Sequence, residues 1–136
     1  MADDPNPADD GEDMQVFVAR VQHGAGLESS SEAEVLARAT LRGLGEQISQ
    51  GQARELSAAL PSELASEVTS GRSAPAKSVD KATFVDQVSA EVHVTDATEV
   101  ERQIRIVLSV VRSWAPDGQV EPTLAQLPEP LAALFT

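Results

Sequence analysis

Two pairs of oppositely charged residues repeat the same spacing along the chain. Glu34 stands four residues before Arg38, and Glu101 stands four residues before Arg105. Residues four apart are neighbours on a helix, so each pair predicts a surface ion pair worth about 0.3–0.5 kcal/mol. The alternative is a polar network buried between two parts of the protein, which would make these four residues a candidate ligand site.

Few other residues offer catalytic or metal chemistry. His23 and His93 are the only histidines, and neither stands in a metal-binding spacing such as H-x-x-x-H or E-x-x-H. Without Cys the chain has no thiol nucleophile, and the serines around Ser30 lack the G-x-S-x-G setting of a hydrolase. We therefore expect no catalytic residue, no cofactor and no metal ligand.

Trp114 is the single tryptophan and the one large amphipathic aromatic side chain. Such residues cover a hydrophobic core or anchor a partner protein. We expect Trp114 to cover the core, and keep an exposed anchor for a partner as the alternative.

The composition limits the classes of partner. The net charge is −12, so direct binding to DNA, RNA or anionic lipid is not expected, because such binding depends on Lys and Arg that neutralise phosphates. Apolar residues make up 41% of the chain, enough for a packed core, whereas aromatic residues make up only 3%. A core of Ala, Leu and Val favours closely packed helices over a sandwich of sheets.

Two segments differ in composition from the rest. Residues 1–13 hold six acidic residues and no basic residue, which predicts a disordered acidic tail. Residues 69–80 are small and polar and contain Pro and Gly, which predicts a linker. The absence of a long apolar run and of a basic N-terminus predicts a cytoplasmic protein, and the Lys-poor, Ala-rich composition suggests a prokaryotic one.

The segments on either side of the linker, 14–68 and 81–136, resemble each other. A shift of 67 residues aligns them without a gap, which indicates an internal repeat. The matched residues include Phe17 with Phe84, Val21 with Val88, Arg38 with Arg105, Leu41 with Leu108, and Leu60-Pro61 with Leu127-Pro128.

Each half carries the pattern of four helices. Apolar spacing predicts first helices at 14–24 and 81–92 and central helices at 32–48 and 99–114, followed by two shorter helices. Capping boxes are predicted to begin at Ser31 and Thr98. Gly24 and Gly26 are expected to end the first helix, and Gly43 and Gly45 to mark close packing against the other half. The predicted fold is all-α: two sequence-related four-helix halves that pack as a pseudo-two-fold helical bundle, with 14–136 as one compact domain.

The order and spacing of these segments resemble the domain-of-unknown-function 2267 family of bacterial and archaeal proteins. The resemblance covers essentially everything after the acidic segment, and it implies an all-α domain with two related halves. No activity or functional residue comes with it. The segments that carry it are FVARV at 17–21, EAEVLARATLRGLGEQIS at 32–49, GQARELSAALPSEL at 51–64, TFVDQV at 83–88 and LAQLP at 124–128.

These observations predict a non-enzymatic protein-interaction or structural module that binds a protein partner or another copy of itself. One alternative is a small-ligand or metal-dependent enzyme that uses a polar site between the halves, at Glu34, Arg38, Glu101, Arg105 or a histidine. Another is an acidic regulator that mimics DNA, with residues 1–13 in the basic site of another protein.

Overall fold

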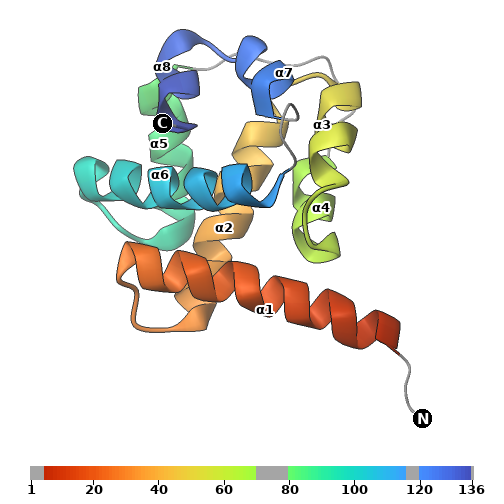
Figure 1. Ribbon diagram of the computed structural model, residues 1–136. Coiled ribbons are helices and arrows are strands. Elements are labelled where there is room, and N and C mark those ends of the chain that lie inside the picture. Colours follow the sequence, from red (N-terminus) through yellow and green to blue (C-terminus); the bar gives the residue numbers. More distant parts are fainter. Residues whose placement is uncertain (1–4, 70–79, 116–119, 136) are drawn as a thin grey trace.

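The computed structural model describes residues 5–69, 80–115 and 120–135, with side chains from residue 13 onward. This part of the chain is helical without strands, so the all-α prediction is confirmed (Figure 1). None of its helices combines the length and apolar character needed to cross a bilayer. The elements are α1 (Pro5–Ala25), α2 (Ser30–Gly45), α3 (Gln50–Ser57), α4 (Ser62–Thr69), α5 (Lys81–Val92), α6 (Ala97–Trp114), α7 (Val120–Ala125), α8 (Glu129–Ala132) and the short 3₁₀ helix η1 (Ala133–Phe135).

Helix α1 begins at Pro5, earlier than the expected start at residue 14. Proline is tolerated in the first turn of a helix because its missing N–H has no partner there in any case. Residues 5–13 of the segment that was expected to be a disordered tail therefore belong to α1, and residues 1–4 lie outside the described part. The expected linker at 69–80 lies largely in 70–79, which is also outside it.

The central helices α2 and α6 begin at equivalent positions, 67 residues apart. The Ser29 hydroxyl caps α2 by accepting the N–H of Glu32 at 3.2 Å. Asp96 caps α6, and its carboxylate accepts the N–H of Thr98 at 3.0 Å. The caps predicted at Ser31 and Thr98 are thus wrong by two residues, because Ser29 and Asp96 offer the same oxygen acceptor one half-turn earlier.

The first helix of each half packs against the central helix of the other half. Helix α1 contacts α6 as well as α2, and helix α5 contacts α2 as well as α6. The two central helices also contact each other, and Figure 1 shows α2 and α6 in the middle of the molecule with α1 below them. The core is therefore shared between residues 5–69 and residues 80–135.

Close approaches to the backbone of α2 fix this packing. A Cβ atom at Gly43 would lie 2.8 Å from Cε1 of Phe84, so the ring of α5 rests directly on α2. A Cβ atom at Gly45 would lie 2.0 Å from the carbonyl oxygen of Val68, so α4 crosses the end of α2 at the same short range. The close packing against the other half is confirmed at Gly43, whereas Gly45 packs against α4 of its own half.

Candidate functional site

The first predicted ion pair belongs to a network on α2. Arg38 donates from Nε and Nη2 to Oε2 of Glu34, at 2.9 and 2.8 Å, and from Nη1 to Oε2 of Glu67 on α4 at 3.0 Å. Arg42 donates to the other oxygen of Glu67 at 3.1 Å and lies 3.6 Å from the carboxylate of Glu91 on α5. Burial would lower the pKa of Arg38, but the hydrogen bonds to Glu34 and Glu67 outweigh it and raise that pKa. The network ties α2 to α4 and reaches the second half.

The second predicted ion pair lies on α6 and has different partners. Arg105 donates to Oε2 of Glu101 at 3.1 Å, and Lys81 at the start of α5 lies 3.2 Å from Oε1 of the same carboxylate. Arg105 also donates to the carbonyl oxygen of Ala133 in η1 at 3.3 Å. Partial burial would raise the pKa of Glu101, but the hydrogen bonds from Arg105 and Lys81 hold it below its usual value. Each pair is therefore formed, and each braces its own set of helices.

Trp114 lies at the end of α6 and packs toward α1. Its ring meets that of Phe17 edge to face, with centroids 5.4 Å apart, and the guanidinium of Arg20 lies 5.5 Å from the Trp114 centroid. The side chain is half-buried against the core, whereas Phe17 is fully buried. This position fits a cover over the core, and a role as a partner anchor stays a prediction.

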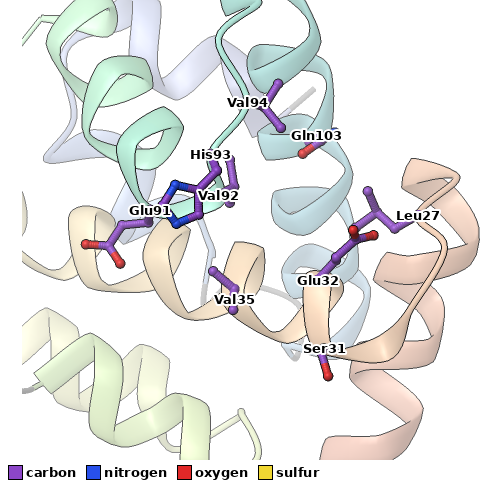
Figure 2. Close-up of a pocket in the computed structure, with 9 residues that line it drawn as sticks. All are labelled: Leu27, Ser31, Glu32, Val35, Glu91, Val92, His93, Val94 and Gln103. Carbon is purple, nitrogen blue, oxygen red and sulfur yellow. The ribbon is translucent and has the colours of Figure 1, made fainter.

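A cleft of about 530 Å³, the inter-half cleft, lies between the two halves. Figure 2 shows that its walls come from the loop before α2, from α2 itself, from the end of α5 and from α6. Its surface is mostly apolar, and Val35 on α2 is 42% exposed although it is a large aliphatic side chain. The residues that line it are Leu27, Ser31, Glu32, Val35, Glu91, Val92, His93, Val94 and Gln103.

His93 lines the inter-half cleft and has an unusual backbone conformation. It follows α5 with φ of 59°, in the left-handed region, and its N–H donates to the carbonyl oxygen of Ser89 at 2.9 Å. Gly26 holds the equivalent place after α1, with φ of 70°. His23 is exposed on α1 and does not line the cleft. In the described residues, no group of three or more His, Cys, Asp or Glu side chains could hold a metal ion.

The wall formed by α6 is held by hydrogen bonds. Gln103 is only 5% exposed, and its Nε2 donates to Oε2 of Glu99 at 3.0 Å. Arg102 donates to the same oxygen at 2.6 Å and to the carbonyl oxygen of Ala25, at the end of α1, at 2.7 Å. The hydrogen bonds from Arg102 and Gln103 lower the pKa of Glu99 to about 2. This arrangement links the α6 wall of the cleft to α1 in the other half.

Each of the two loops that line the cleft is fixed by a hydrogen bond from a side chain to a backbone carbonyl oxygen. Gln22 donates from Nε2 to the carbonyl oxygen of Leu27 at 3.4 Å. In the second half, the hydroxyl of Ser89 donates to the carbonyl oxygen of Val94. Both donors and both acceptors are equivalent under the 67-residue shift, so Leu27 and Val94 enter the cleft from corresponding loops.

Sequence reasoning missed the inter-half cleft. The candidate charged residues Glu34, Arg38, Glu101 and Arg105 do not line it. Leu27 and Val94 lie in loops, where helical periodicity gives no signal, and Val35 lies on α2 outside the buried face of that helix. One signal for the special position of His93 was present in the sequence. The 67-residue shift aligns His93 with Gly26, and glycine commonly ends a helix in the left-handed conformation.

Comparison with known proteins gives one assignment. The family described as Uncharacterized conserved protein (DUF2267) matches residues 14–134, which span both halves, and the resemblance found in the sequence is confirmed. No curated protein matches the chain.

Proposed function

The chain belongs to the DUF2267 family of uncharacterized conserved proteins, and from its own geometry we propose that it is a non-enzymatic helical module that binds another protein. The inter-half cleft carries this proposal. A concave, mostly apolar surface with an exposed aliphatic side chain on a helix is the kind of surface that receives a partner helix. Val35 is that side chain, and Leu27, Val92 and Val94 surround it.

The candidate charged residues support a structural rather than a catalytic role. Arg38 and Arg105 are engaged by carboxylates of their own helices and by groups on neighbouring elements. A catalytic carboxylate needs a pKa near the working pH, whereas the pKa of Glu101 is shifted downward. These groups hold helices together, and we assign no reaction to them.

We also propose that the two halves pack about a pseudo-two-fold axis. Helices α2 and α6 begin 67 residues apart, as do α4 and α8. The exchange of partners, with α1 against α6 and α5 against α2, is what such an axis requires. The matching bonds of Gln22 and Ser89 support the same relationship.

A small organic ligand is the second candidate occupant of the cleft. Its volume of about 530 Å³ falls within the roughly 300–1,000 Å³ of typical ligand pockets. Gln103, Glu32 and His93 would supply the polar contacts that orient such a ligand. The mostly apolar surface and the exposure of Val35 favour a protein partner.

Two matched variants test the proposal in full-length protein. Val35→Asp places a charge in the cleft, whereas Val16→Asp places the same charge on α1 at a valine that is 46% exposed and outside the cleft. Crosslinked complexes are recovered from the native cells and identified by mass spectrometry. We expect a recurring protein partner that is lost with Val35→Asp and retained with Val16→Asp. A partner that survives Val35→Asp, or recovery of self-crosslinks alone, would contradict the proposal.

A further inference from the structure

We propose that the partner segment bound in the inter-half cleft is a cationic amphipathic helix. The inference rests on the proposed function and adds the chemistry of the partner. Its apolar side chains would lie against Val35 and Val94, and its Lys or Arg side chains would lie between Glu32 and Glu91 at the rim.

The charges around the cleft support a cationic partner. Of the described residues that line it, none is Lys or Arg, whereas Glu32 and Glu91 are both among them. Among the described residues Glu32 has no ion pair, and its Oε1 accepts the N–H of Glu28 at 3.2 Å. Glu91 has a side chain that is 51% exposed, and its one ion-pair contact in the described part of the chain is with Arg42 at 3.6 Å. Each carboxylate therefore has room for a further cation.

A second copy of this chain would be a poor occupant. The chain carries 22 acidic residues against 10 basic residues, for a net charge of −12. Docking two copies at acidic rims would place like charges together, which costs binding energy. A basic partner instead gains from attraction at the rim and from faster encounter with a strongly negative protein.

The helical form of the partner follows from the surface that receives it. The described part of the chain has no strand, so it offers no sheet edge to which an extended peptide could add a strand. An extended segment on an apolar wall would leave backbone N–H and C=O groups without partners, and this is costly. A helix satisfies those groups internally and presents an apolar stripe to Leu27, Val35 and Val94.

Defined peptides test the inference directly. The probes are three fluorescently labelled helical peptides of one length, each with Leu on one face and with Lys, Gln or Glu on the other. Binding to the full chain is measured by anisotropy at two salt concentrations, and the site is mapped from amide shifts in NMR spectra. We expect the Lys peptide to bind most tightly, with shifts centred on Val35, His93 and Val94.

Charge-matched variants separate the cleft from general attraction. Glu32→Gln with Glu91→Gln removes both rim carboxylates, and we expect affinity for the Lys peptide to fall about tenfold or more. Glu46→Gln with Glu55→Gln removes the same charge at exposed positions outside the cleft, and we expect a loss under about threefold.

The possible results distinguish a failure of the cationic-helix inference from a failure of the proposed docking function. Equal binding of the Gln and Lys peptides in the cleft overturns the cationic partner and leaves the docking surface standing. Equal losses in both double variants also overturn it, since the attraction would then be non-specific. If no peptide shifts the cleft amides while Val35→Asp still abolishes the cellular complex, the helix inference fails alone.

Discussion

Gly26 and His93 occupy the same left-handed backbone position at equivalent points of the two halves. Each residue follows the first helix of its half, with φ of 70° at Gly26 and 59° at His93. Glycine adopts this conformation freely, whereas a residue with a Cβ atom is strained in it by about 1–2 kcal/mol. The strained residue is the one that lines the inter-half cleft.

Replacing His93 with Gly is expected to stabilise the protein by about 0.5–1 kcal/mol. The gain from relieved backbone strain exceeds the entropy that glycine adds to the unfolded chain. Urea unfolding followed by the fluorescence of Trp114 measures the change. Gly26→Ala is the control and is expected to lower stability by about 1 kcal/mol, because it introduces at φ of 70° the strain that His93 already bears. A destabilised His93→Gly protein would show that the side chain contributes contacts that outweigh the strain.

Replacing Gly45 with Ala is expected to destabilise the protein, although alanine is the better helix former. The new Cβ would lie 2.0 Å from the backbone oxygen of Val68, so α2 and α4 would have to separate. Overpacking of this kind costs about 1–3 kcal/mol, more than the roughly 1 kcal/mol gained in helix propensity. Gly51→Ala on α3 has nothing within 4 Å of its Cβ and is expected to raise the melting temperature instead.

Replacing Thr40 with Val is expected to stabilise the core of α2. Thr40 is fully buried, and within the described residues its hydroxyl oxygen has no hydrogen-bond partner. The equivalent residue in the second half is Val107. Removing an unsatisfied buried hydroxyl relieves about 1 kcal/mol or more of desolvation cost. Thr123→Val is the matched control. It should destabilise, because Thr123 accepts a hydrogen bond from the buried Gln52 at 2.8 Å.

Replacing Glu67 with Gln is expected to cost more stability than replacing Glu34 with Gln. Glu67 binds both Arg38 and Arg42 and has a side chain only 16% exposed, whereas Glu34 is paired with Arg38 and is 43% exposed. We expect a loss of about 1–2 kcal/mol at Glu67 and under about 0.5 kcal/mol at Glu34 in denaturant unfolding. Equal losses would contradict a network centred on Glu67.

The pKa of Glu99 gives stability a dependence on acid pH. Hydrogen bonds from Arg102 and Gln103 hold it at about 2 in the folded protein, compared with 4.5 for a free side chain. A lowered pKa stabilises the folded state above the unfolded value, and this stabilisation is lost as pH falls from about 4.5 toward about 2. Titration of the Glu99 carboxyl carbon by NMR measures the pKa directly. Arg102→Gln is expected to return it toward its usual value, and an unchanged pKa would refute the assignment.

Much of the helix pattern could be predicted from the sequence. The helix predicted at 81–92 has the same bounds as α5, because a clear apolar face lies between the capping Asp80 and the end at His93. The predicted starts of α2 and α6 were two residues late, since several polar residues in a row compete for each cap. The start of α1 was missed because proline and acidic residues are typical of disordered segments as well as of helix beginnings.

The site was harder to predict because it depends on packing between distant segments. The ion pairs at Glu34 and Glu101 could be predicted because they are local to one helix. The role of Glu67 could not, since it depends on α4 crossing α2 and the repeat places Leu134 at the equivalent position. The inter-half cleft combines Val35 with Val94, and only the fold brings these residues together.

The packing of each first helix against the central helix of the other half also determines when the chain can fold. Helix α1 meets α6, so its final neighbour is synthesised dozens of residues later. Contacts between distant segments slow folding, because the intervening chain has to be ordered first. When only the first half has emerged from the ribosome, the apolar faces of α1 and α2 are therefore uncovered and available to chaperones. We expect the native core to form only after α6 has emerged.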